Sequence, residues 1–249
     1  MTADAVERFA RNGALIAGGA AAILLQVSDP VVGTGVAEHS DFKHRPLDRL
    51  RNTLTFVYAV ILGTPSEAQR IAGYVNRAHT GISGAMDATH QLWVAATLYD
   101  TALRVHERLY GPVDDDLANL VLAAYEPLAT SLQVPPTDWP KTRAAFDEYF
   151  ANYSATLVVT DDARQVTHDL FHPVTIPWWG RAALPFVSAL TSTLLTPALR
   201  DALGLPNRPR RSALAWGVAR VVARVAPRSL REWPSRYYLR RIRASRPPQ

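Results

Sequence analysis

Apolar residues recur every three to four positions along most of the chain, whereas the strict alternation typical of β-strands is nearly absent. Pro46 opens one such segment, which continues through Leu50, Leu54 and Val57 and closes at Gly63. This spacing places the apolar side chains on one face of a helix. The pattern therefore predicts an all-α protein.

Start and stop signals divide the remaining sequence into further helices. The run Thr64 to Glu67 (TPSE) has the residues of a capping box, and the helix that it starts is predicted to bury Ile71, Tyr74 and Val75 together with Ala78. More helices are expected at about residues 87–109, 114–132, 137–159, 161–171, 183–194 and 197–203, followed by basic terminal helices. Their unequal lengths predict a single irregular, orthogonal helical bundle.

One domain spanning residues 1–249 is expected, with 208–249 as a basic C-terminal helical segment that could be peripheral. No Gly/Ser-rich or Pro-rich linker divides the chain before about residue 205, and the 48% hydrophobic content supports a sizeable core. The apolar run Ala14 to Val27 is shorter than the roughly 20 residues of a membrane-spanning helix, so it is predicted to be a buried helix. It also lacks the basic start of a secretory signal, and we expect a cytoplasmic protein.

Basic residues are concentrated near the C-terminus. The net charge is +5, and residues 208–246 are rich in arginine with Glu232 as their one acid. This segment also contains Trp216, Trp233 and two tyrosines, which fits peripheral contact with the inner face of an anionic membrane. A solvated helix that closes the domain explains the same residues, and no nucleic-acid partner is expected.

Several classes of chemistry are disfavoured by missing residues. The chain has no cysteine, which excludes disulfides, thiolate nucleophiles, iron–sulfur clusters and thiolate-ligated haem. It also lacks a phosphate-binding loop, a dinucleotide-binding glycine motif, a nucleophile elbow and a His-Glu-x-x-His motif. Any metal must therefore be bound by histidine, carboxylate or other oxygen ligands.

Two polar residues interrupt the apolar face of the helix that begins at Pro46. Arg49 and Thr53 are four positions apart, so they lie on one helical face. A buried guanidinium needs anionic or carbonyl partners. Either Arg49 forms a structural ion pair with Glu38, Asp41 or Asp48, or it binds a buried anion or oxygen ligand.

The histidines allow structural and functional interpretations. His79 lies near the end of its helix. A histidine in such a place is more often a hydrogen-bonded core residue than a metal ligand. His39 is predicted to lie in a loop that enters a helix, with a capping or hydrogen-bonding role. His168 and His172 have the i,i+4 spacing of a metal-binding pair, but no third ligand is evident. His90 is expected near the exposed start of a helix.

Five short runs, in order, resemble a known family. They are LLQVSDP (24–30), GVAEHSDF (35–42), PLDRLRNT (46–53), VNRAH (75–79) and QLWVAATL (91–98). Together they resemble the catalytic domain of the ER-bound oxygenase mpaB and rubber oxygenase (latex-clearing protein) family, over roughly residues 14–200.

The resemblance implies a buried haem pocket and an oxygenase activity. Members of the family are helical proteins that bind haem b noncovalently, and rubber oxygenases cleave isoprenoid double bonds with dioxygen. By position, His79 would be the proximal iron ligand, and Arg49 and Thr53 would lie beside the haem as cofactor-binding and candidate catalytic residues. We also expect His39 to be one of the cofactor-binding residues.

Two positions depart from the family pattern. Asn52 stands where rubber oxygenases carry a lysine, so no lysine can approach the iron from the distal side at this position. Ala95 replaces a histidine that is common in relatives. No residue matches the family's proposed catalytic carboxylate, although Glu38 and Asp41 are nearby candidates.

The expected function is a haem-b-dependent oxygenase that uses dioxygen on an apolar, isoprenoid or lipid-like small molecule. The alternative is a non-catalytic protein that binds haem or lipid at a membrane surface.

Overall fold

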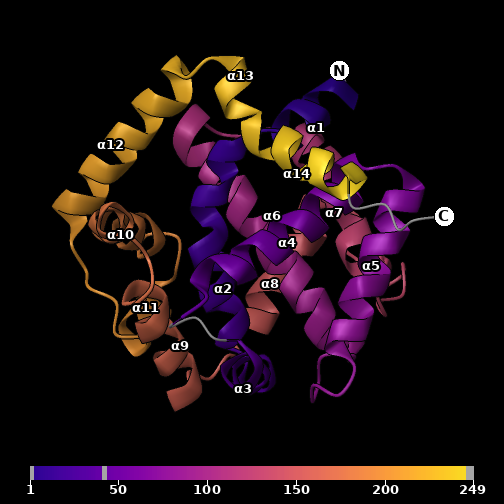
Figure 1. Cartoon of the computed structure of the whole chain (residues 1–249), viewed down its shortest axis with the longest axis horizontal. Helices are drawn as coiled ribbons and strands as arrows, with labels where there is room; N and C mark the ends of the chain where they lie inside the picture. Colours follow the sequence, from indigo (N-terminus) through magenta and orange to yellow (C-terminus); the bar gives the residue numbers. More distant parts are fainter. Residues whose placement is uncertain (1–2, 41–43, 245–249) are drawn as a thin grey trace.

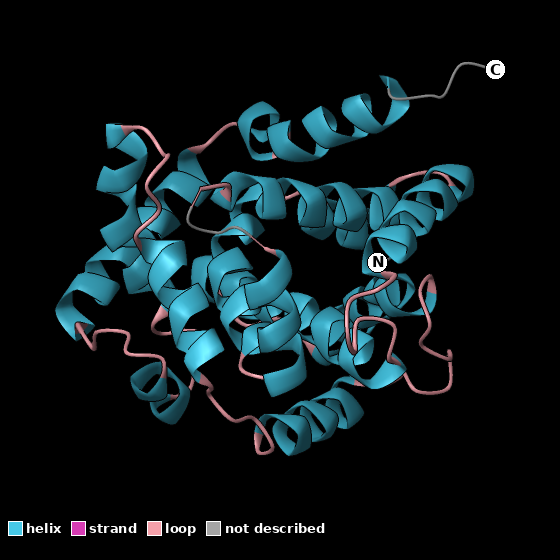
Figure 2. Ribbon diagram, turned by 60° about the horizontal axis from the view of Figure 1, so that its bottom comes forward, coloured by secondary structure: helices cyan, strands magenta, loops and turns pink. Residues whose placement is uncertain are grey.

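The computed structural model describes residues 3–40 and 44–244, and every regular element in these two ranges is a helix. The predicted all-α class is therefore confirmed (Figure 2). In chain order the elements are α1 (Ala3–Ala10), the 3-10 helix η1 (Gly13–Gly18), α2 (Gly19–Val27), α3 (Pro30–His39), α4 (Pro46–Leu62), α5 (Pro65–His79), α6 (Ala88–Tyr110), α7 (Asp115–Thr130), α8 (Arg143–Ser154), α9 (Asp161–Phe171), α10 (Trp178–Thr191), α11 (Pro197–Ala202), α12 (Pro209–Val225), α13 (Arg228–Arg231) and α14 (Trp233–Ala244).

The longest helix, α6, lies near the centre of an irregular bundle (Figure 1). It packs against η1, α2, α7 and α12, and more than half of its 23 residues are buried. A helix that is buried on several sides must be apolar around most of its circumference, as this one is. Next to it, α4 and α5 form a helical hairpin, and α4 also packs against α7 and α14.

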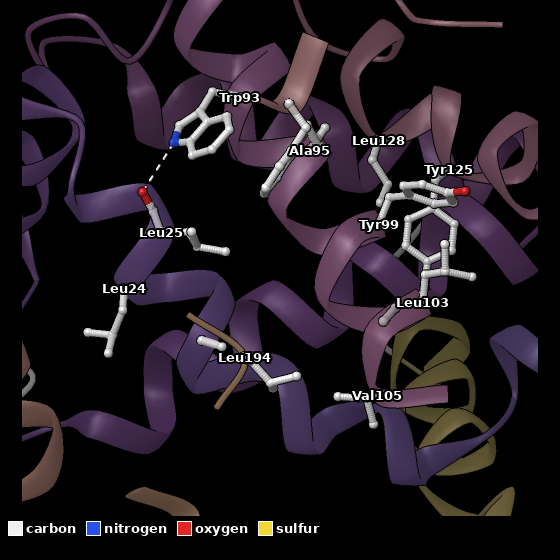
Figure 3. Close-up of a cluster of buried hydrophobic side chains, with 14 of the residues drawn as sticks. Leu24, Leu25, Trp93, Ala95, Tyr99, Leu103, Val105, Tyr125, Leu128 and Leu194 are labelled. Carbon is white, nitrogen blue, oxygen red and sulfur yellow. Dashed lines mark hydrogen bonds between the residues drawn. The ribbon is translucent and has the colours of Figure 1, made fainter. Parts of the chain in front are cut away.

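Aromatic residues of α6 fix the neighbouring helices (Figure 3). Trp93 is completely buried, and its indole Nε1 donates a hydrogen bond to the Leu25 carbonyl at 3.2 Å. The Trp93 ring also stacks on Tyr153, with 4.5 Å between centroids. Tyr99 donates its hydroxyl to the Ala118 carbonyl at 3.1 Å. The polar atoms of these large side chains are thus satisfied while their rings fill the core.

Several predicted elements differ from those of the structure. The run Ala14 to Val27 is mostly helical, but it divides into η1 and α2. The helix expected at 137–159 begins only at Arg143, because Thr142 caps it and Trp139 is buried in the preceding turn. Tyr74 and Ala78 were predicted to be buried, but both are exposed, Tyr74 to 53%.

The arginine-rich segment after residue 207 packs against the rest of the protein. α12 contacts α10 and α6, and α14 contacts α4. Trp216 donates its Nε1 proton to Thr193 Oγ1 at 2.8 Å, and Leu239 and Ile242 are almost completely buried. This segment therefore contributes side chains to the core, and the division of the chain into domains stays a prediction.

Within residues 3–40 and 44–244, no single helix combines the length and apolar character needed to cross a bilayer. Asp4–Ala10 and Gly13–Val27, which meet at a bend of 50°, reach those values only when they are taken together.

Candidate functional site

The candidate site is an open cavity of about 560 Å³ lined by residues of α3, α4, α5, α6 and the turn before α6. Its volume is within the range of about 300–1,000 Å³ that is typical of small-molecule sites. His39, Arg49, Thr53 and His79 all line it, so the structure brings the four predicted site residues to one cavity. Much of the remaining wall is apolar and includes Phe56.

The α4–α5 hairpin positions three of these residues. α4 ends at Gly63, and the predicted capping box starts α5: the Glu67 amide donates to Thr64 Oγ1 at 3.3 Å, and the Thr64 amide donates to the Glu67 carboxylate at 2.9 Å. The two helices therefore reverse direction within a short turn. Arg49 and Thr53 on α4 consequently lie on the same cavity as His79 at the end of α5.

Arg49 is half-buried and has no carboxylate partner among the described residues. Its Nη1 donates to Ser40 Oγ at 3.0 Å, and burial lowers the pKa of its guanidinium. Of the three predicted partners, Asp48 binds Arg45 and Arg51 instead, and Asp41 lies outside the described residues. A cation in the wall of a cavity without a described counter-ion is suited to bind an anion.

His79 is the last residue of α5 and is half-buried. Its Nδ1 atom is buried without a hydrogen-bond partner, and no described residue binds its other ring nitrogen. Burial lowers the pKa of the imidazole, and the positive charge of Arg49 lowers it further. His79 is therefore neutral near pH 7, and a neutral imidazole is the form that binds a metal ion.

Thr53 lies between the large cavity and a smaller one. The smaller cavity is about 80 Å³, and both are lined by Thr53, Gln26 and Leu98. The Thr53 hydroxyl has no hydrogen bond to a described residue, whereas Gln26 Nε2 is held by Thr97 Oγ1 at 2.9 Å. The two cavities therefore lie next to each other, with Thr53 in the wall of both.

The predicted setting of His39 was wrong. It is the last residue of α3 and not part of a loop, and its Nδ1 donates to the Gly35 carbonyl one turn earlier at 3.1 Å. The ring lines the cavity, with the Glu38 carboxylate 4.0 Å away. Asp29 caps the start of this helix and Pro30 fits its first turn.

Three amide side chains that the sequence did not single out hold the end of α5 in place. Gln91 on α6 hydrogen-bonds Gln133, accepting its backbone amide at 2.8 Å, and Gln133 Nε2 donates to Asn76 at 3.1 Å. Asn76 is one turn before His79. No sequence signal links Gln133 to the distant Asn76, although Gln91 and Asn76 both lie in runs that resemble the family.

The remaining histidines have different environments. His90 lines the cavity, and its Nδ1 lies 3.3 Å from the Gly84 carbonyl. His106 lies outside the cavity and stacks on Phe9, with 5.0 Å between centroids. His168 and His172 stack on each other and are exposed, and the described residues supply no third ligand to them.

The positions that depart from the family pattern also line this cavity. Asn52 provides an amide in place of a lysine, and Ala95 provides a methyl group in place of an imidazole. The nearby wall therefore has neither an ammonium group nor a second imidazole at these two places. His79 has no hydrogen-bond partner and Arg49 no carboxylate partner among the described residues, so this donor set fits a b-type haem with one protein ligand and an anionic edge.

Comparison with known proteins identifies the chain's relatives. The family model "ER-bound oxygenase mpaB/B'/Rubber oxygenase, catalytic domain" matches residues 6–225. Uncharacterized proteins of Mycobacterium bovis and Mycobacterium tuberculosis are each 34% identical over 238 residues, covering 88% of this chain and 92% of theirs. No solved structure matches the chain. The resemblance is thus confirmed, and the chain belongs to the family of ER-bound oxygenase mpaB and rubber oxygenase catalytic domains.

Proposed function

We propose that this protein is a haem-b-dependent oxygenase that uses dioxygen on an apolar small molecule of isoprenoid or lipid-like character. One observation carries the proposal. In a member of an oxygenase family, the neutral His79 and the cation Arg49 line one cavity of cofactor size, and among the described residues His79 has no hydrogen-bond partner and Arg49 no carboxylate partner.

The residues that would hold the cofactor follow from their chemistry. His79 would bind the iron through its neutral imidazole, because it is the cavity histidine whose ring is free of other partners. Arg49 would pair with a haem propionate, since a guanidinium binds a carboxylate through two parallel hydrogen bonds. Ser40 would keep the Arg49 side chain in place through its hydroxyl.

The bound haem would supply the redox-active iron that dioxygen chemistry requires. The protein would contribute orientation, hydrogen bonds and exclusion of water. Thr53 has a hydroxyl that is free to donate to a polar atom in the cavity. Phe56, Val75 and Val94 form apolar wall, which lowers the local dielectric and strengthens each hydrogen bond made inside.

The shape of the cavities supports an elongated apolar substrate. The smaller cavity shares Thr53 and Leu98 as wall residues with the large one, and its own wall is mainly aliphatic. A hydrocarbon chain would gain about 0.8 kcal/mol for each methylene group that it buries there. The wall of the smaller cavity is mostly apolar, so the fit of a hydrocarbon chain is expected to decide substrate preference there.

A hemin titration tests the cofactor proposal. Wild-type protein is expected to shift the Soret band of hemin with saturation at one equivalent. Arg49→Gln should weaken hemin affinity by about 10- to 100-fold, because a charge-assisted bond contributes about 1.5–3 kcal/mol. The matched control is Arg77→Gln on α5, where the arginine is exposed and packs over the Tyr74 ring outside the cavity.

The outcomes separate the candidate functions. Saturable hemin binding together with oxygen uptake on apolar substrates supports the oxygenase. Hemin binding without any oxygen uptake would identify a non-catalytic haem-binding protein. If the wild type does not bind hemin, or if Arg49→Gln and Arg77→Gln bind it equally, the cofactor site proposed here is wrong.

A further inference from the structure

One face of α12 carries an apolar stripe that nothing in the described chain covers. The stripe consists of Leu214, Val218, Val221, Val222 and Val225, whose exposed fractions are 70%, 47%, 61%, 54% and 73%. Their spacing places them on one side of the helix. Figure 1 shows that α12 lies at the edge of the molecule.

The other side of the same helix is buried. Ala215, Trp216 and Ala223 pack inward, and Trp216 is fixed by its hydrogen bond to Thr193. The stripe therefore cannot turn inward without breaking this packing. Soluble monomers rarely expose large contiguous apolar patches, and those that do generally use them for binding.

Unpaired arginines flank the stripe. Arg208, Arg210, Arg211 and Arg224 are exposed, and none forms an ion pair with a described carboxylate. The acid of this segment, Glu232, is already shared by Arg228 and Arg236 on α13 and α14. The apolar stripe thus lies in a positively charged surface.

A further exposed aromatic residue begins the neighbouring helix. Trp178 is the first residue of α10, which packs against α12, and 80% of its surface is exposed. Tryptophan is favoured at the boundary between lipid headgroups and acyl chains, since its ring is apolar and its indole nitrogen is polar. An exposed aromatic side chain of this kind is thus present on a helix that packs against α12.

We propose that the outer face of α12 binds the surface of an anionic lipid bilayer. The valines and Leu214 would enter the boundary between headgroups and acyl chains, while the arginines would bind lipid phosphates. A second copy of this chain fits less well, because the two arginine clusters would repel each other. Nucleic acid also fits less well, because an aliphatic stripe offers nothing to a phosphate backbone. This proposal does not depend on the cofactor or on the reaction.

The test is co-sedimentation of the full-length protein with vesicles. Vesicles of phosphatidylglycerol and phosphatidylcholine are compared with vesicles of phosphatidylcholine alone, at low and high salt. Val221→Ser/Val225→Ser should lower partitioning onto the anionic vesicles by about tenfold, because two apolar side chains no longer enter the bilayer. The matched control is Leu120→Ser/Val158→Ser, which removes two exposed apolar side chains elsewhere.

The charge component has its own variant. Arg210→Gln/Arg211→Gln should remove most of the preference for anionic over neutral vesicles, and added salt should have the same effect on the wild type. All variants replace exposed side chains, and circular dichroism checks that each is folded.

Several results would overturn the proposal. One is that the wild type does not bind anionic vesicles at low salt. Another is that Val221→Ser/Val225→Ser binds these vesicles as well as the control Leu120→Ser/Val158→Ser does. Sedimentation could show a vesicle-free dimer that Val221→Ser/Val225→Ser dissociates, which would assign the stripe to a second copy. Binding of a DNA duplex in preference to vesicles would assign it to nucleic acid.

Discussion

At the scale of single residues, burial decides which groups carry charge. His79 and His106 are both half-buried with an unpartnered Nδ1, and burial lowers the pKa of each imidazole. They differ in what surrounds the ring, because His79 lines the large cavity and His106 stacks against Phe9. Two histidines whose pKa values are both lowered by burial therefore differ in their access to a ligand.

Asp100 on α6 gives a prediction about pH. Burial raises its pKa to about 6, although the charge and hydrogen bond of Arg104 act in the opposite direction. The folded protein therefore retains a proton that the unfolded chain has already released, and stability falls as the pH rises from about 4 to above 6. The free energy of unfolding of wild type relative to Asp100→Asn is expected to decrease by about 3 kcal/mol over this range.

Urea unfolding at a series of pH values measures this difference. A second variant, Asp138→Asn, changes an exposed aspartate and serves as the control. A pH-independent difference between wild type and Asp100→Asn would show that Asp100 ionises as it does in the unfolded chain.

At the scale of elements, the turn between α4 and α5 sets the geometry of the cavity. A Cβ atom on Gly63 would lie 2.3 Å from the Ala59 carbonyl oxygen, which is much closer than real contacts allow. Gly63→Ala should therefore displace the start of α5 and lower the free energy of unfolding by about 1–3 kcal/mol.

Gly217→Ala is the comparison for that variant. Gly217 lies within α12, and a Cβ atom there has no neighbour within 4 Å. Alanine is favoured over glycine inside a helix by roughly 0.5–1 kcal/mol, so this substitution should stabilise the protein. Thermal unfolding of both variants checks the pair, and equal effects would contradict the account of the turn.

The helices predicted best from the sequence are those with capping residues, proline or glycine at their ends. Pro46, Gly63 and the capping box gave α4 and the start of α5 almost to the residue, because caps depend only on neighbouring residues. The start of α8 was misplaced, since it depends on the burial of Trp139 against Leu122 on another helix. Tyr74 was misassigned because periodicity alone does not define which residues at the edge of a helix face are covered.

At the scale of the whole molecule, long-range contacts assemble the site and its supports. The resemblance grouped His79 with Arg49 and Thr53, and the structure places all three on one cavity. The Gln91–Gln133–Asn76 connection joins segments distant in sequence, so no local pattern could reveal it. The apolar stripe on α12 was likewise hidden, because its valines resemble core residues until the packed face of that helix is known.

The packing of the C-terminal segment also changes how membrane binding can be tested. α14 packs against α4, and Arg243 forms an ion pair with Glu67 at 3.1 Å. Removing everything after Asn207 would expose the core and disturb the hairpin that carries Arg49. Substitutions on the outer face of α12 test the membrane proposal without this damage.

The most direct test of the central claim compares His79→Ala with His106→Ala. Each variant is loaded with hemin, and its haem content, ferric and ferrous spectra and melting temperature are measured. His79→Ala is predicted to lose the wild-type spectrum and to recover it with added imidazole, because the small ligand can enter the cavity that truncation leaves. His106→Ala is predicted to lower the melting temperature while keeping the wild-type spectrum. If His79→Ala retains wild-type haem content and spectrum, His79 is not the axial ligand and the proposed function loses its main support.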